Sequence, residues 1–329
     1  MRNILFINGN SQAFADSLME GAPDGFSVTC IPASSNDKEK MQALRDVTCT
    51  VLFPGILPVE IMREAKSLRL IQLLSAGYDK INVEAAAELG IYVATNGSAN
   101  AGAVAEHTIA LLLAVYKKLI PADASLRAGT WRKSVNVANV FEVAGKTVGI
   151  IGAGSIGRKV ASRLKAFETE IVYYSRSQVP EMETTLDARR LSLEELLRVS
   201  DIITLHTPLL KETRGIIGAR ELAMMKPHAV LLNTGRGELV DEAALIAALK
   251  GGRIAGAGLD VFAPEPPQQG NPLFEFDNVV LTPHFGGHSF EGLRRRAAVA
   301  WSNIVKVTAG QKPDFVVGVS AVSLREPRT

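Results

Sequence analysis

Short apolar runs alternate with longer segments of helical spacing along most of the 329-residue chain. In the first part the apolar runs lie at 3–7, 50–54, 68–74 and 91–96, and turn-forming residues follow several of them. Apolar runs bounded by turn residues are typical of parallel strands buried on both faces. The segments between them carry helical patterns, so residues 1 to about 98 predict a small βα domain.

A second βα series begins after residue 145. It predicts strands near 147–151, 170–175, 201–207, 228–234, 254–261 and 278–284. Strands that alternate with helices predict a doubly wound parallel sheet, in which ligands bind at the carboxyl ends of the strands. Polar residues fall at those ends in this chain. A final helix near 291–310 is expected to return to the first domain.

The segment 101–126 has helical spacing and predicts a long bridging helix broken near Pro121. The fold class is therefore α/β, with two Rossmann-like doubly wound domains and an active-site cleft expected between them. We assign 1–98 plus 289–329 to a flavodoxin-like substrate domain and 99–288 to a dinucleotide-binding domain. The wide apolar face of the bridging helix also predicts packing against a second copy of the chain.

A glycine loop follows the first strand of the second series, in "VGIIGAGSIGRKVASRL". Gly152 permits a tight turn, Gly154 lets a pyrophosphate approach the backbone, and Gly157 lets helix and strand pack closely. Ser155 and Ile156 begin the helix, whose amino end attracts phosphate. Because strand, loop, helix and next strand all have suitable lengths, the loop predicts dinucleotide binding.

The next strand ends at the position that selects the adenine ribose, where an Asp or Glu would favour NAD. This chain has Ser175, Arg176 and Ser177 there instead. No acid repels a 2′-phosphate, and Arg176 supplies positive charge. We therefore expect NADP(H) to be preferred, with NAD(H) possible; the alternative is a solvated polar turn.

Composition narrows the classes of partner and location. A net charge of +2 with mixed signs gives no reason to expect nucleic acid or an anionic membrane as partner. The apolar run 108–115 is far shorter than a membrane span, and the amino end lacks a secretory signal pattern. Cys30 and Cys49 are interpreted as buried hydrophobic residues, which favours a cytoplasmic location. No cluster at metal-ligand spacing predicts a metal site.

Five stretches together resemble the D-isomer-specific 2-hydroxyacid dehydrogenase family. They are "AVAEHTIALLL", "GAGSIG", "LLNTGRGELVDEAALIAAL", "GAGLDVFAPEPP" and "LTPHFGGHS". The resemblance implies a catalytic triad of Arg236, Glu265 and His284. In that scheme His284 gives a proton to the carbonyl oxygen of a 2-keto acid, and Glu265 orients it. Arg236 holds the substrate carboxylate and also borders the cofactor, as does His284.

The resemblance also implies the rest of the pocket. Backbone N–H groups at Ala76 and Gly77 would hold the substrate carboxylate, and Phe53 would face the substrate or else be an ordinary core aromatic. His107 and His228 are interpreted as structural or surface residues, and Trp131 and His288 are given no ligand role. The remaining cofactor residues implied are Val104, His206, Thr207, Pro208, Thr234, Gly235, Asp260, Gly286 and Gly287.

These observations predict an NADPH-dependent homodimeric enzyme that reduces a small 2-keto acid, such as glyoxylate or hydroxypyruvate, to the D-2-hydroxy acid. Two alternatives stay open from the sequence. One is an NAD-linked dehydrogenase of 2-hydroxy acids or of phosphite. The other is a non-catalytic corepressor of the same fold that binds the dinucleotide.

Overall fold

The computed structural model describes residues 2–9, 12–131 and 137–318, and it divides into two compact units. The first unit comprises residues 1–100 and 288–329, and the second comprises residues 101–287. The sequence pattern predicts boundaries after residues 98 and 288. Each unit has its own sheet and its own hydrophobic core.

The first unit is built on a six-stranded sheet in the order β13-β5-β4-β3-β1-β2. The five strands from β1 to β5 are parallel, and their order is that of a flavodoxin-like fold. The short β13 pairs with β5 in the antiparallel sense. The strands are β1 (Arg2–Asn8), β2 (Phe26–Pro32), β3 (Cys49–Phe53), β4 (Leu70–Leu73), β5 (Tyr92–Ala94) and β13 (Val316–Val317).

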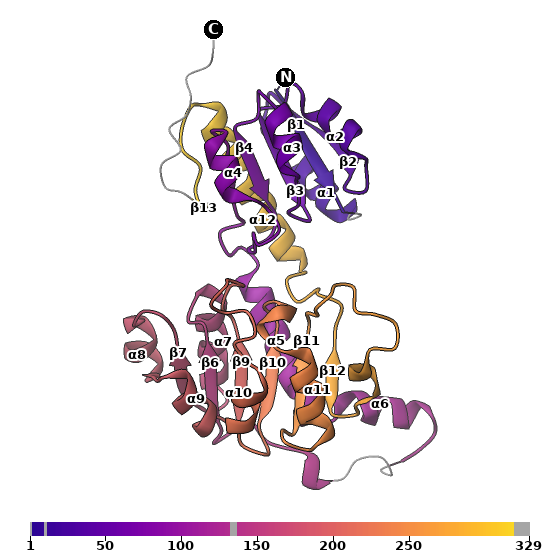
Figure 1. The fold of residues 1–329 in the computed structure, drawn as a ribbon, viewed down its shortest axis with the longest axis vertical. Coiled ribbons are helices and arrows are strands. Elements are labelled where there is room, and N and C mark those ends of the chain that lie inside the picture. The colour runs from indigo at the N-terminus through magenta and orange to yellow at the C-terminus, as the bar shows by residue number, and fades with distance from the viewer. Residues whose placement is uncertain (1, 10–11, 132–136, 319–329) are drawn as a thin grey trace. The chain divides into compact units, whose positions relative to one another are not determined.

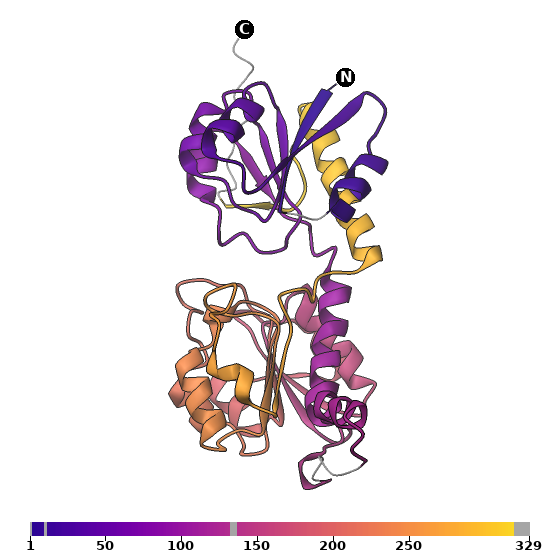
Figure 2. The ribbon, with the colours of Figure 1, turned by 90° about the vertical axis from the view of Figure 1, so that its right-hand side faces the viewer.

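Helices cover both faces of this sheet (Figures 1 and 2). On one face α1 (Gln12–Glu20) and α12 (Phe290–Thr308) pack on β-strand residues such as Phe6 and Val51. On the other face lie α2 (Asp37–Leu44), α3 (Val59–Glu64) and α4 (Val83–Glu88). The final helix thus belongs to the first unit, as its sequence pattern predicts.

The second unit has a seven-stranded parallel sheet in the order β12-β11-β10-β9-β6-β7-β8. Counted from β6, this is the doubly wound order of dinucleotide-binding folds with one strand added at the β12 edge. The strands are β6 (Thr147–Ile151), β7 (Glu170–Tyr174), β8 (Arg189–Arg190), β9 (Ile202–Leu205), β10 (Val230–Asn233), β11 (Gly256–Leu259) and β12 (Val279–Leu281).

Two hydrophobic clusters fill the two faces of this second sheet (Figure 2). One face carries α5 (Ala101–Tyr116), α7 (Ser155–Lys165) and α8 (Pro180–Leu186). The other carries α9 (Leu193–Val199), α10 (Ala219–Met224) and α11 (Glu242–Lys250). Helix α6 (Leu119–Arg127) follows α5, and 3-10 turns occur at η1 (Val137–Asn139), η2 (Gly237–Leu239) and η3 (Pro272–Glu275).

The bridging segment differs from its prediction in two ways. The break between α5 and α6 lies at Lys118, which has a left-handed φ of 51°, and Pro121 lies within the first turn of α6. A proline there costs little, because the first-turn N–H groups have no helical partner. Most of α5 is buried inside the second unit, so its wide apolar face is accounted for by packing on the sheet.

Three strands and one cysteine were not predicted correctly. Strands β2, β8 and β13 are absent from the predicted set, and Cys30 on β2 is exposed where a buried residue was expected. Cys49 is buried, and that burial raises the pKa of its thiol to about 12. Across the part of the chain that the structure describes, no helix combines the length and apolarity that crossing a bilayer requires.

Candidate active site

The glycine loop after β6 has the geometry that a dinucleotide requires. Gly152 has a φ of +99°, and a Cβ placed on it would lie 2.6 Å from the His206 carbonyl oxygen. A Cβ on Gly157 would lie 2.1 Å from the Gly152 oxygen, which is closer than any real contact. Gly154, the N-cap of α7, has nothing within 4 Å of that position. The loop is therefore tightly packed on one side and open where phosphate would bind.

Ser155 and Ile156 begin α7 directly after this opening. Their backbone N–H groups belong to the first turn of the helix, which lacks internal acceptors. The residues present thus fit the pyrophosphate of a nicotinamide dinucleotide.

The residues at the end of β9 border the same loop. The His206 amide donates to the Ile151 oxygen, and the His206 Nε2 lies 2.8 Å from the Thr204 hydroxyl. Its Nδ1 is buried without a hydrogen-bond partner among the described residues. Burial lowers the pKa of this ring to about 3, so the imidazole is neutral. Thr207 is half-buried and Pro208 is exposed beyond it.

The turn after β7 carries Ser175, Arg176 and Ser177. The Ser175 hydroxyl donates to the Ser177 carbonyl oxygen, so it contributes to the turn itself. Arg190, on β8, donates from Nη2 to the Ser175 oxygen at 3.0 Å and to the Arg176 oxygen at 2.9 Å. The Arg176 and Ser177 residues are exposed. Arg190 was not predicted, because nothing in the local sequence shows that β8 places it beside this turn.

The three residues of the implied triad lie after three neighbouring parallel strands. Arg236 follows β10, Glu265 follows β11 and His284 follows β12, so the loops that carry them share one edge of the sheet. The His284 Nδ1 lies 2.9 Å from the Glu265 Oε2. The His284 side chain is 43% exposed and that of Glu265 24%, which leaves the ring accessible to a reactant. The structure thus brings the side chains of His284 and Glu265 into contact.

Local hydrogen bonds fix the loop that carries Arg236. The Asn233 side chain donates to the Arg236 oxygen at 2.8 Å and accepts from the Gly235 amide at 3.0 Å. The Arg236 guanidinium donates from Nη1 to the Gly235 oxygen. Asn233 is buried at the end of β10. Its side-chain hydrogen bonds hold the loop where a regular turn would use backbone hydrogen bonds. The sequence marks Asn233 only as a polar residue at a strand end.

Val104 and Thr234 are connected through Thr108 on α5. The Thr108 hydroxyl donates to the Val104 oxygen at 2.8 Å, so it must accept from the Thr234 hydroxyl 3.0 Å away. All three residues are buried. This contact joins the bridging helix to the loop after β10.

Asp260 is the centre of a further network at the end of β11. It is 2% exposed, and its carboxylate accepts from the Thr282 hydroxyl and from the Phe285 and Gly286 amides. His107 lies 3.4 Å from the same carboxylate. Burial alone would raise the pKa of Asp260, but the bonds from His107, Thr282 and Gly286 bring it below its ordinary value. Gly287 follows this segment.

The remaining substrate residues implied by the resemblance, Phe53, Ala76 and Gly77, lie in the first unit. Ala76 and Gly77 follow β4 and are half-buried, and the Ser75 hydroxyl donates to the Gly77 oxygen at 2.7 Å. Phe53 ends β3, with its ring 4.6 Å from Phe14 and 6.3 Å from His288. The loops after β3 and β4 therefore form one group at the carboxyl edge of this sheet.

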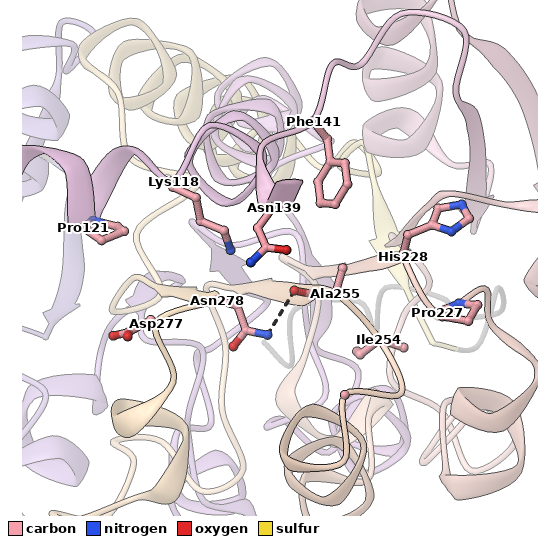
Figure 3. Close-up of a pocket in the computed structure, with 11 residues that line it drawn as sticks. Lys118, Pro121, Asn139, Phe141, Pro227, His228, Ile254, Ala255, Asp277 and Asn278 are labelled. Carbon is pink, nitrogen blue, oxygen red and sulfur yellow. Dashed lines mark hydrogen bonds between the residues drawn. The ribbon is translucent and has the colours of Figure 1, made fainter. Parts of the chain in front are cut away.

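A cavity of about 620 Å³ lies elsewhere in the second unit (Figure 3). Its lining includes Lys118, Asn139, Phe141, His228 and Asp277. Residues that precede β10, β11 and β12 contribute, so the cavity lies at the amino ends of these strands. None of the predicted site residues lines it. It is therefore separate from the edge that carries the glycine loop and the triad.

Comparison with known proteins agrees with this geometry. Residues 109–286 match the model of the D-isomer specific 2-hydroxyacid dehydrogenase NAD-binding domain. A glyoxylate reductase of Thermococcus litoralis is 40% identical over 293 residues, covering 87% of this chain and 88% of its own. A glyoxylate reductase of Aeropyrum pernix is 43% identical over 274 residues, covering 82% of each chain.

Solved structures are also similar. An NADPH-dependent glyoxylate/hydroxypyruvate reductase from Sinorhizobium meliloti, in complex with NADP and malonate, superposes with a TM-score of 0.85. It is 30% identical, and the match covers 96% of this chain and 97% of that one. The chain therefore belongs to the D-isomer specific 2-hydroxyacid dehydrogenase family, as an enzyme that uses a nicotinamide dinucleotide.

Proposed function

We propose that the chain uses NADPH to reduce a small 2-keto acid, with glyoxylate and hydroxypyruvate as the candidates, to the D-2-hydroxy acid. The observation that carries this proposal is the 2.9 Å contact between His284 and Glu265 at the edge of the sheet that carries the glycine loop. Relatives that are named glyoxylate reductases support the substrate class.

His284 is the proposed proton donor. When bound, the nicotinamide supplies the hydride to the carbonyl carbon. The His284 Nδ1 faces Glu265, so Nε2 is the ring nitrogen that can give a proton to the carbonyl oxygen. The carboxylate of Glu265 contacts Nδ1 and fixes the orientation of the ring. A histidine suits this step because its charge changes close to neutral pH.

Arg236 is the proposed partner of the substrate carboxylate. A guanidinium presents paired donors that fit a carboxylate and also stabilise negative charge on the carbonyl oxygen. The loop contacts of Asn233 hold Arg236 at the sheet edge, so little ordering remains for binding. Backbone N–H groups at Ala76 and Gly77 are proposed to complete the carboxylate site, and Phe53 to border the substrate.

The preference for NADPH rests on the turn at residues 175–177. It carries no acid that would repel a 2′-phosphate, and Arg176 and Ser177 are exposed. Since the Ser175 hydroxyl donates within the turn, Arg176 and the Ser177 hydroxyl are the proposed phosphate ligands. The NADP and NADPH complexes among the structural neighbours support the same cofactor.

Steady-state kinetics with a panel of 2-keto acids and both cofactors test the proposal. Turnover of glyoxylate or hydroxypyruvate with NADPH is the expected result. Turnover with NADH alone would favour the NAD-linked alternative. Tight dinucleotide binding without turnover of any 2-keto acid would instead indicate the corepressor alternative. Ranking the acids by kcat/KM identifies the preferred substrate.

A further inference from the structure

His107 lies on α5, and its sequence context predicts only a structural or surface residue. Its side chain is 15% exposed and reaches the loop after β12 that carries His284. We infer that His107 is a positioning residue for the proton donor, acting through Thr282 and Asp260. This inference rests on the proposed role of His284.

The partners of the Thr282 hydroxyl show which groups donate and which accept in the hydrogen bonds from His107 to Asp260. The Thr282 hydroxyl lies 2.6 Å from the Asp260 Oδ1 and donates to it, because a carboxylate can only accept. The same oxygen lies 2.8 Å from the His107 Nε2. The Thr282 hydroxyl has one proton and donates it to Asp260, so His107 must be the donor in its contact with Thr282. The His107 Nε2 therefore carries a proton.

Asp260 transmits this contact to the backbone on the far side of His284. Its carboxylate accepts from the Phe285 amide at 3.1 Å and the Gly286 amide at 2.9 Å. Thr282 lies two residues before His284, and these amides follow it directly. The network thus holds the chain on both sides of the proton donor.

Such support matters because His284 has a strained backbone. Its φ is +53°, in the left-handed region that a residue with a side chain rarely adopts. Conformations of this kind persist only where the surrounding structure determines them. The amides bonded to Asp260 belong to the two residues that follow His284, so the network is suited to maintain this conformation.

The packing leaves no room for the segment to approach α5 differently. A Cβ on Gly286 would lie 2.8 Å from both the Asp260 Oδ2 and the His107 Cδ2. The His107 and Phe285 rings are 5.0 Å apart. His107 therefore contacts the loop through its ring as well as through its Nε2 proton.

The first test compares His107→Leu with His107→Gln. Leucine cannot donate to Thr282, so the loop should loosen and kcat should fall by roughly tenfold to 10²-fold, the scale of small misplacements of a catalytic group. The KM for the keto acid should change little, because the proposed carboxylate ligands are elsewhere. Glutamine keeps a donor near the position of Nε2 and should restore most of kcat. The midpoints of the pH–rate profile should stay in place.

His228→Leu is the matched control. His228 also contacts a buried aspartate in the second unit, with its Nε2 2.9 Å from the Asp201 Oδ1. It lies near the amino end of β10, away from the triad. This variant should lose some stability and keep kcat. An equal loss of kcat in both leucine variants would show a general structural effect and overturn the inference.

Hydrogen exchange tests the inference without depending on turnover. In His107→Leu, the amides of Phe285 and Gly286 should exchange faster by roughly tenfold or more, since they lose their protection when the Asp260 network opens. Unchanged exchange at these two amides would overturn the inference whatever the kinetics show. Faster exchange at these amides in a protein that turns over no keto acid would support the role of His107 in the network and reject only the proposed function.

A double-mutant cycle tests whether His107 acts through Thr282. Thr282→Val removes the relay hydroxyl with little change of shape. If His107 acts through Thr282, the double variant His107→Leu/Thr282→Val should lose no more kcat than the more severe single variant. Effects that multiply would show that His107 acts by another route and would reject the proposed path.

Discussion

His284 combines a strained backbone with a side-chain contact to Glu265, and we expect both properties to bear on catalysis. Its Nδ1 contacts Glu265 while the rest of the ring is accessible. Replacing His284 with alanine removes the proposed proton donor, so turnover should fall by roughly 10²–10⁴-fold, the usual scale of general acid catalysis. Steady-state reduction of a keto acid by NADPH measures this. Turnover at the level of the unmodified protein would reject the role.

The carboxylate of Glu265 should matter through the orientation of the His284 ring. Its Oε2 lies 2.9 Å from the His284 Nδ1. Glu265→Ala removes this contact, so kcat for keto acid reduction should fall by roughly tenfold to 10²-fold, the scale of small misplacements of a catalytic group. Steady-state kinetics with NADPH measure this. Arg189→Gln, a change on the exposed strand β8, should leave kcat unchanged.

Replacing Asp201 should change the stability of the protein and leave its turnover unchanged. It is buried, and it accepts from the Thr147 amide, Lys226 and His228 at 2.8–2.9 Å. Burial would raise the pKa of Asp201, but these three bonds lower it below the ordinary value of 3.8. Asp201→Asn should reduce the free energy of unfolding at neutral pH by about 1–3 kcal/mol, because the neutral amide is a weaker acceptor for these three donors than the carboxylate.

The direction of the Asp201 pKa shift determines how the stability difference between the unmodified protein and Asp201→Asn depends on pH. A carboxyl with a lowered folded pKa stabilises the protein above its ordinary value of 3.8 and loses this contribution as pH falls through the folded pKa. The two proteins should therefore converge in stability as pH falls below 3.8 and through the folded pKa of Asp201. Asp123→Asn, at an exposed ion pair with Arg127, should change unfolding little at any pH. Denaturant unfolding across pH measures both variants.

At the scale of elements, the turn after β7 is expected to select between NADPH and NADH. Arg176 and Ser177 are exposed on it, and Arg190 holds two of its carbonyl oxygens. Charged hydrogen bonds contribute roughly 1.5–3 kcal/mol each, so NADPH should be favoured over NADH by about 10²-fold. The double variant Ser175→Asp/Arg176→Ala replaces attraction by repulsion and should prefer NADH.

The comparison of kcat/KM for the two cofactors at fixed ionic strength tests this. Arg189→Ala removes an equal charge from β8 and should leave the preference unchanged. A preference for NADH in the unmodified protein, or for NADPH in the double variant, would show that the turn does not select the cofactor.

Elements with a strong apolar pattern were predictable, and those without one were not. Strands such as β4 and β10 are buried along their whole length, and most of their residues are apolar. Strand β2 is an edge strand, half-exposed, and its residues do not form a continuous apolar run. Strands β8 and β13 have two residues each, too few to show a period.

The same contrast holds within the site. The glycine loop was predictable because it depends on glycines at fixed spacing between a strand and a helix, whereas the triad was expected only from the resemblance to a known family. Arg190 lies 14 positions along the chain from its partner Arg176, and His107 lies 175 positions from its partner Thr282. Only the folded chain brings these residues together. The break at Lys118 was also missed, because a non-glycine residue in the left-handed region has no sequence signal comparable to that of Pro121.

At the scale of the whole molecule, the surface of α6 predicts self-association. Leu119, Ile120 and Leu126 are 56%, 56% and 58% exposed, while α5 is largely buried in its own unit. Neighbouring exposed apolar side chains on one helix mark an interaction site, and symmetric dimers are the commonest assembly. We therefore assign the predicted homodimer to the surface of α6 rather than to that of α5.

The unmodified protein should have about twice the 35.2 kDa chain mass in solution. Leu119→Asp/Leu126→Asp places two charges seven residues apart, on one face of α6, and should yield monomers because burying those charges in an interface is costly. Val305→Asp, an apolar residue exposed on α12 in the other unit, is the control and should leave the dimer intact. Light scattering across micromolar concentrations distinguishes the states. A monomeric unmodified protein would refute the dimer, and a double variant that stays dimeric would place the interface elsewhere.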